Sequence, residues 1–411
     1  MPRRISGTLT GKDFTLPPGE TWVLDGDVEV RASGDIWLLG DIVCDARSAP
    51  GAGIKLRTAK GDILIAGRIA TATGADGDSP PVAPSVRAGD GRAGGAIDVS
   101  AGGRLVLLES ARLRSGAGGA GGRAEARGFG PAHALVKALS GAGGPGGTIR
   151  LSAGDVMILE GEIRAGFGGW GGEALAIGAP AGVPGEDGRP KDQKPKGEKK
   201  NQAPRPGPAV VEATAKGGGA GGDLLLATGS AGGVIKLAGV LAAGAGGHSF
   251  KATARGGRRS TALLEPGGRG GNVSIRLREA PPAIDQAKTC TICPGTGGDS
   301  GDRSITVDPD EPPRLFFDGA EAEATHDALA KVGHPADPPD AGGGAAGTVT
   351  AVAVWPGSPP IEEAIALRIE PAAAGSTTAS IAIVAGKRER DETGSSARGA
   401  VPGAATRAEL P

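Results

Sequence analysis

The sequence predicts an all-β fold, a right-handed parallel β-helix whose glycine-rich insertions leave from one corner. Three observations predict it: a repeated phrase, the phase of the apolar residues inside it, and the glycine runs that bracket the insertions. The fullest copy runs from Gly147 to Gly166, and further copies begin at Gly53, Gly95 and Gly222. A unit of about 20 residues cannot bury its own apolar face, so stacked copies must share a core.

Aligned copies give three columns of apolar residues, one for each strand of the phrase. Alternation with period two inside each strand predicts parallel strands whose inward side chains stack about 4.8 Å apart. Parallel crossovers are nearly always right-handed. A β-sandwich is the alternative, because short strands with Gly and Pro turns also describe that fold. The columns are Ile54, Ile97, Ile149, Leu224 and Val273; Ile36, Ile63, Leu105, Met157 and Ile235; and Ile42, Ile69, Leu113, Ile163 and Leu241.

Small residues follow the third column and predict a tight corner, at which every insertion leaves the repeat. Since each coil has the same geometry, the insertions are expected to line up along one side of the solenoid. The corner residues are Cys44, Thr71, Ser115, Ala165 and Ala243, and the insertions cover 74–94, 116–146, 166–221 and 244–270.

Glycine runs open and close the last three insertions, as at 116–122 and 141–147. Glycine at this density allows extended strands with three residues per turn to pack closely. We expect six such segments to form a polyglycine bundle beside the β-helix, with flexible tethers as the alternative.

Four of the ten aromatic residues fall in these insertions: Phe129, Phe167, Trp170 and Phe250. Loops on a rigid scaffold often carry recognition, so these residues are candidates for binding a ligand or partner. The alternative is that they fill the seam between the insertions and the coils.

The outward side of the second column is also apolar, in Trp37, Leu64, Val106 and Ile158. A strand that is apolar on both sides is normally covered on both sides. We therefore expect this row to be an association face, covered by another part of the chain or by a second copy. An alignment shifted by one residue is the alternative, because it would place these side chains on the other face.

The remaining chain divides around the β-helix, which spans residues 30–280. Residues 1–29 are expected to form an amino-terminal cap, and residues 281–303 a linker. Strand-like runs resume over 304–386 and lack glycine brackets, which indicates a separate small β-domain. Residues 387–411 are charged and rich in small residues, which is typical of a disordered tail.

Composition excludes several classes of protein. Glycine and proline supply 77 and 32 of the 411 residues, a share usual in low-complexity chains, but the fixed apolar phase indicates a folded one. The formal net charge of −1 gives no field to attract nucleic acid. No stretch approaches the roughly 18 apolar residues of a membrane span. The first residues lack a secretory signal, so the expected location is the cytoplasm, or a cell or particle surface reached without a leader.

The sequence contains few residues suited to metal or redox chemistry. Cys290 and Cys293 form a CxxC pair, which is either a labile thiol pair, a local disulfide or half of a metal site. Cys44 falls in the corner and is expected to be a small core residue. No cofactor is expected. The weak metal candidates, suited to calcium or else part of a solvated acidic loop, are Asp299, Asp302, Asp308 and Asp310.

Catalysis on polysaccharides requires carboxylates in particular places. Inverting hydrolases place two of them roughly 6.5–9.5 Å apart. Here Asp98 is the only acidic residue aligned beside the first column, and Glu160 and Glu162 lie near Arg112, Arg114 and Arg164. That mixture is more typical of surface ion pairs than of a catalytic set, so no catalytic residue is assigned.

The repeat resembles the haemagglutinin-type β-helix of filamentous bacterial adhesins, in phrases such as 102–108 and 153–159. It is also similar to phage tailspikes, and the glycine brackets resemble those of phage receptor-binding tips with polyglycine sandwiches. The resemblance covers roughly residues 30–277 and transfers no functional residue. It departs from many β-helices in lacking asparagine ladders, since only Asn201 and Asn272 occur.

This pattern favours a non-enzymatic adhesin or particle-associated fibre whose insertions recognise a surface polysaccharide or another protein. The alternative is a polysaccharide lyase or glycoside hydrolase with the pectate-lyase-like β-helix fold. A third hypothesis is a structural element whose apolar face binds copies of itself, as a homo-oligomer.

Overall fold

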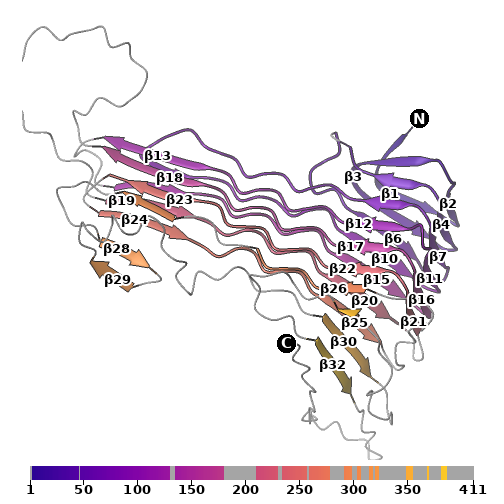
Figure 1. The fold of residues 1–411 in the computed structure, drawn as a ribbon. Coiled ribbons are helices and arrows are strands. Elements are labelled where there is room, and N and C mark those ends of the chain that lie inside the picture. The colour runs from indigo at the N-terminus through magenta and orange to yellow at the C-terminus, as the bar shows by residue number, and fades with distance from the viewer. Residues whose placement is uncertain are drawn as a thin grey trace, which may run out of the picture.

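The computed structural model describes residues 2–45, 47–129, 135–179, 210–229, 234–256, 259–277 and 291–298. Beyond these it describes the backbone of short strands only, at 303–306, 314–317, 320–323, 349–354, 368–369 and 381–386. Every regular element in the described residues is a β-strand. Figure 1 shows the strands stacked in parallel columns, with a long extension that leaves the columns on one side.

Three columns of parallel strands form the solenoid, in the order that the repeat predicts. Successive copies of each strand pair with one another, so that Ile97 lies between Ile54 and Ile149 in the first column. The first column comprises β6 (Ile54–Thr58), β10 (Ile97–Ala101), β15 (Ile149–Ala153), β20 (Leu224–Thr228) and β25 (Val273–Leu277). The second comprises β4 (Ile36–Leu38), β7 (Ile63–Ile65), β11 (Leu105–Leu107), β16 (Val156–Leu159) and β21 (Val234–Leu237). The third comprises β5 (Asp41–Val43), β8 (Arg68–Ala70), β12 (Arg112–Arg114), β17 (Glu162–Arg164) and β22 (Val240–Ala242).

The inward side chains of the three columns share one apolar core. Ile54, Ile97 and Ile149 are at most 1% exposed and stack coil upon coil. Each such side chain stabilises the fold by about 1.5–3 kcal/mol relative to exposure. The prediction that equivalent aliphatic residues form continuous internal stacks is confirmed.

The amino-terminal residues form a first coil. Strand β1 (Arg3–Gly11) pairs in parallel with β3 (Thr21–Ala32), and β2 (Phe14–Leu16) begins the second column. The first half of β3 pairs with β5 and its second half with β6. Because one strand contacts both neighbours, the first and third columns belong to one continuous sheet.

Aspartates, rather than asparagines, link the early coils. The carboxylate of Asp13 accepts a hydrogen bond from the amide of Asp35 at 2.9 Å, and that of Asp35 accepts one from Asp62 at 2.8 Å. Asp62 in turn accepts from the amide of Arg104 at 2.7 Å. These side chains therefore satisfy turn amides that the ladder of strands leaves unpaired.

The glycine brackets form an ordered bundle, and the tether alternative is wrong for these segments. Within the bundle two amides of every three donate to a neighbouring segment, as from Gly168 to Ala245 and from Gly169 to Gly144, both at 2.8 Å. This period of three matches an extended helix with three residues per turn. The segments that lead from the solenoid into the insertions form one row, which we call the outgoing row: 72–78, 116–122, 166–172, 244–248 and 294–298. The segments that lead back to the solenoid form the returning row: 89–95, 141–147, 217–222 and 266–271.

Hydroxyl groups join the bundle to the corner of the solenoid. Thr71 Oγ1 donates to Gly95 O at 2.6 Å and accepts from the amide of Gly116 at 2.9 Å. Ser115 repeats this arrangement one coil later, with Gly147 and Gly166. The small residues expected at the corner thus include two that connect successive coils.

The two rows lead into two further sheets that the sequence did not predict. Their shared core is almost entirely alanine and valine, so the sheets can approach closely, which suits chains arriving from a two-row glycine bundle. One sheet contains β13 (Ala124–Phe129), β18 (Ala174–Ala179), β23 (Ala252–Arg255) and β27 (Arg303–Thr306). The other contains β9 (Ser85–Arg87), β14 (Leu135–Leu139), β19 (Val210–Ala215) and β24 (Arg259–Leu264).

Most of the described strands after residue 280 extend existing sheets. β26 (Thr291–Cys293) pairs with β22, and β30 (Val349–Val354) pairs with β25. β31 (Arg368–Ile369) and β32 (Ile381–Gly386) continue these two columns, while β28 (Arg314–Phe317) and β29 (Ala320–Glu323) form a hairpin. The open edge of each column offers unpaired backbone groups that the next strand satisfies. The expected tail, 387–411, lies outside the described residues.

Candidate functional site

The outgoing row of the glycine bundle presents one residue in three to solvent. The other two positions of each turn face neighbouring segments: a Cβ on Gly168 or Gly169 would lie 1.9 Å from a carbonyl oxygen. Side chains larger than hydrogen are therefore confined to the third position. From segment to segment these positions hold Thr73 and Asp76, Ala117 and Ala120, Phe167 and Trp170, Ala245 and His248, and Thr296.

Phe167 and Trp170 occupy this position in one segment and are 60% and 57% exposed. Three residues of such a helix span roughly 9 Å, so the two rings follow one another along the segment. His248 lies in the adjacent segment, with its ring centroid 6.2 Å from that of Trp170 at 73°, an edge-to-face contact. The rings therefore form one continuous aromatic surface.

Two alanine residues, Ala117 and Ala120, lie beside the rings on the side opposite His248. The amides of Gly118 and Gly121 donate to the carbonyls of Phe167 and Trp170 at 2.8 Å, which places Ala117 and Ala120 in the neighbouring segment. We call Phe167, Trp170, His248, Ala117 and Ala120 the aromatic shelf. Both sides of the shelf are fixed through backbone hydrogen bonds rather than through mobile loops.

The other two aromatic candidates are placed differently. Phe250 is 45% exposed, two residues after His248, at the point where the bundle meets β23. Phe129 ends β13, and its side chain lies outside what the structure describes. Because Phe167, Trp170 and Phe250 are exposed, these three do not fill a seam between insertions and coils.

Polar and charged residues end the aromatic shelf on the side where the bundle leads into the two alanine-rich sheets. Arg123 and Glu173 occupy the next outward positions of their segments, and Arg123 Nε lies 3.3 Å from Glu173 Oε2. Lys251 follows in the next segment. Sequence reasoning missed His248, although the period of three in the glycine runs would have placed it beside Trp170.

The expected association row lies in register on the outer face of the second column. Trp37 is opposite Leu64, Leu64 opposite Val106, and Val106 opposite Ile158, so the shifted alignment is ruled out. Trp37 is 48% exposed and the other three are half-buried. The insertions extend from the opposite side of the solenoid (Figure 1), so they do not cover this row.

The charged ladder around Glu162 is an ion-pair network. Its carboxylate lies 2.9 Å from Arg114, 2.5 Å from Arg164 and 3.7 Å from Arg112. Burial works to raise the pKa of Glu162, but the hydrogen bonds from Arg114 and Arg164 outweigh it and hold that pKa below its usual value. A general acid needs the opposite shift.

The cysteines and acidic residues assemble no site among the described residues. Cys44 is half-buried against the core, and burial raises the pKa of its thiol, which disfavours reactivity. Cys293 lies in β26, whereas Cys290 and the four candidate aspartates are outside the described ranges. No group of three or more His, Cys, Asp or Glu suited to a metal ion occurs in the part of the chain that the structure describes.

Comparisons with family models, curated proteins and solved structures find no match. No helix among the described residues is long and apolar enough to cross a membrane.

Proposed function

We propose that this protein is a non-enzymatic recognition protein of a cell or particle surface. In this proposal a right-handed parallel β-helix carries the polyglycine bundle, and the aromatic shelf binds a surface polysaccharide. The observation that carries the proposal is the exposure of Phe167 and Trp170, 60% and 57%, on a segment whose backbone is hydrogen-bonded on both sides. Exposed apolar clusters on a soluble protein mark interaction sites.

The geometry suits a linear carbohydrate better than a deep-pocket ligand. The shelf is open and elongated, with rings spaced roughly 9 Å apart along one axis. The C–H faces of sugar rings carry partial positive charge and pack on the negative faces of aromatic rings. Because the bundle holds the rings in place, binding loses little conformational freedom on the protein side.

A polysaccharide-cleaving enzyme is the alternative. It needs an acid and a base placed on either side of the scissile bond, whereas Glu162 is paired with arginines and has a lowered pKa. The shelf itself offers His248 beside Trp170, with the Arg123–Glu173 pair at its border. This composition favours binding over cleavage.

The test measures retention and cleavage together. The full chain is incubated with a panel of bacterial surface polysaccharides, and both the bound polymer and the new reducing ends are measured. We expect retention without new chain ends, and loss of retention in Phe167→Ala and Trp170→Ala. Trp37→Ala is the matched control, because it removes an exposed tryptophan from another face and should bind normally. New chain ends would overturn the binding proposal in favour of the enzyme. Equal retention by all variants would show that the aromatic shelf is not the polysaccharide-binding site.

A further inference from the structure

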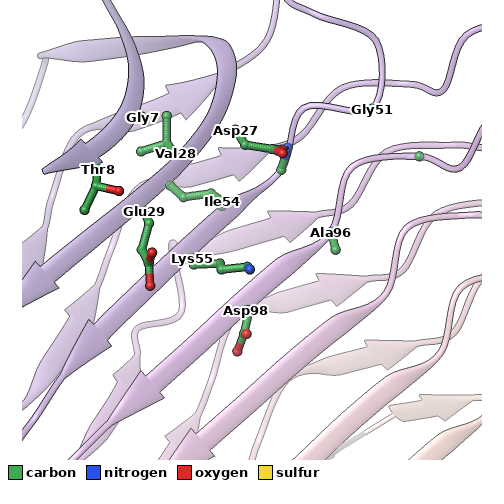
Figure 2. Close-up of a pocket in the computed structure, with 12 residues that line it drawn as sticks. Gly7, Thr8, Asp27, Val28, Glu29, Gly51, Ile54, Lys55, Ala96 and Asp98 are labelled. Atoms are coloured by element: carbon green, nitrogen blue, oxygen red, sulfur yellow. The ribbon is translucent and has the colours of Figure 1, made fainter.

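A pocket lies on the solenoid itself, beside the amino-terminal coil. It has a volume of about 460 Å³ and is lined by residues of β1, β3, β6 and β10 together with Gly51, Gly53, Gly94 and Ala96 (Figure 2). Small-molecule pockets typically measure roughly 300–1,000 Å³. The lining reaches the returning row of the bundle, whereas the aromatic shelf is on the outgoing row.

The outward residues of four strands cross this pocket in register. Thr8 is opposite Glu29, Glu29 opposite Lys55, and Lys55 opposite Asp98. Cross-strand neighbours of opposite charge normally pair, so this register alone would place Lys55 between the carboxylates of Glu29 and Asp98.

The structure pairs these carboxylates with arginines instead. Glu29 lies 2.8 Å from Arg31 and 3.7 Å from Arg57, and Arg57 also reaches Asp98 at 3.3 Å. The hydrogen bond from Arg31, together with the charges of Arg31, Arg57 and Lys55, outweighs the effect of burial and holds the pKa of Glu29 below its usual value. The ammonium of Lys55 makes no hydrogen bond or ion pair with any described residue, and in Figure 2 its side chain points away from Glu29.

Asp27 supplies a positioned acceptor at the rim. Its Oδ1 accepts the amide of Gly53 at 2.9 Å, which fixes the carboxylate while leaving further lone pairs for a ligand. The rim is closely packed, since a Cβ on Gly53 would lie 2.8 Å from Ala96 O.

The balance of donors and acceptors identifies the class of ligand. Lys55 offers three N–H donors, while Thr8 and the carboxylates of Asp27, Glu29 and Asp98 offer acceptors. Hydroxyl groups satisfy both, since each can donate to a carboxylate and accept from an ammonium. The three carboxylates are balanced by Lys55, Arg31 and Arg57, so the site favours a ligand without net charge.

We propose that this pocket binds an uncharged, multiply hydroxylated sugar, with Lys55 and Asp27 as its principal polar contacts. The site is independent of the aromatic shelf, and it is a second carbohydrate-binding site on the same chain.

Titration of the isotope-labelled full chain with D-glucose, D-galactose and D-mannose, followed by amide chemical shifts, tests this. We expect at least one of these sugars to shift the amides of Gly53 and Lys55. Lys55→Met and Asp27→Asn should each weaken that binding about tenfold or more. Lys236→Ala is the matched control, because it removes an exposed lysine from the second column and should change nothing.

Two charged probes decide the ligand class. Tighter binding of D-glucuronate would show an anion site, and tighter binding of D-glucosamine a cation site; either result would overturn the proposal, as would the absence of shifts with every neutral sugar. Trp170→Ala should leave monosaccharide binding unchanged. If Trp170→Ala loses polymer retention but still binds monosaccharides, the two sites act independently. The shelf proposal and the pocket proposal can therefore fail separately.

Discussion

The amide of Gly169 donates a hydrogen bond to the carbonyl of Gly144 at 2.8 Å, across the two rows of the glycine bundle. A Cβ on Gly169 would lie 1.9 Å from the carbonyl oxygen of Gly119. Position 169 therefore requires glycine, because segments packed closely enough for these backbone hydrogen bonds leave no room for a side chain between them.

Replacing this glycine should destabilise the bundle. Gly169→Ala places a methyl group against backbone that cannot move away, and overpacking of this kind costs roughly 1–3 kcal/mol or more. We expect a lower urea midpoint and faster amide exchange in the segments around residues 119 and 144. Ala120→Ser is the matched control, because position 120 faces solvent. An unchanged midpoint in the glycine variant would contradict the close packing.

The Glu162 network should make stability depend on acid pH. Its folded-state pKa is below the usual 4.5, so its contribution is fully present above that value and is lost as the pH falls through the folded pKa. Glu162→Gln should cost on the order of 1 kcal/mol at neutral pH, and the difference from the natural chain should shrink below about pH 4.5. Urea unfolding from pH 3 to pH 7 measures this. Glu109→Gln is the matched control, because it removes an exposed carboxylate outside this network. A difference for Glu162→Gln that stays constant down to pH 3 would sink the prediction.

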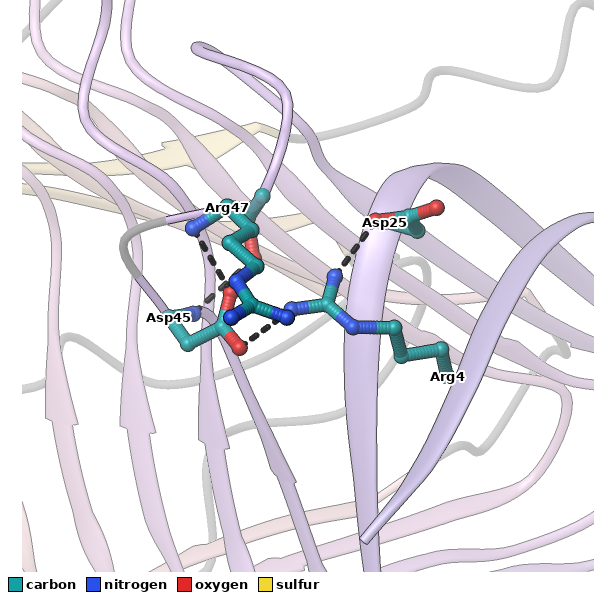
Figure 3. Close-up of polar contacts among 5 residues, drawn as sticks. Arg4, Asp25, Asp45 and Arg47 are labelled. Atoms are coloured by element: carbon teal, nitrogen blue, oxygen red, sulfur yellow. Dashed lines mark hydrogen bonds and ion pairs between the residues drawn. The ribbon is translucent and has the colours of Figure 1, made fainter.

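Arg4 joins the first coil to the rest of the solenoid. Its guanidinium lies 2.5 Å from Asp25 in β3 and also pairs with Asp45 after β5, whose carboxylate accepts the amide of Arg47 at 2.8 Å (Figure 3). Arg4→Ala should therefore speed amide exchange in β1 without changing exchange in β15.

High salt screens exposed ion pairs, so the natural chain in concentrated salt should approach the behaviour of this variant. Arg3→Ala is the matched control, because Arg3 is exposed on the same strand and forms no ion pair with described residues. Equal exchange in both variants would show that the pairs do not hold β1.

The apolar row of Trp37, Leu64, Val106 and Ile158 predicts self-association. A half-exposed tryptophan continuous with three aliphatic residues favours contact with a second copy over contact with water. Light scattering should show a mass that rises with concentration, and Trp37→Lys should remain monomeric. Phe250→Lys alters an exposed aromatic residue elsewhere and should associate like the natural chain. A natural chain that stays monomeric at high concentration rules this interface out.

Much of the solenoid could be predicted from sequence, because the buried positions recur as apolar residues at a fixed place in each repeat. Ile54, Ile97 and Ile149 recur at one phase of the repeat, and only stacking of like positions buries them all. The insertions recur at one point of the same repeat, so they had to leave together. The aromatic shelf was half predicted: Phe167 and Trp170 were candidates, but His248 joined them only through the period-three geometry of the bundle.

The sequence by itself determined which residues are repeated, which side of each strand is apolar, and where glycine is required. Only the tertiary structure decided that strands after residue 280 extend the columns, that alanine-rich strands close into a second pair of sheets, and that Arg57 rather than Lys55 pairs with Asp98. The physical reason is the range of the interactions. The spacing of apolar residues along the sequence indicates directly which side of a strand is buried. The partner of a strand edge or of a charged group depends instead on competition among groups far apart in the chain.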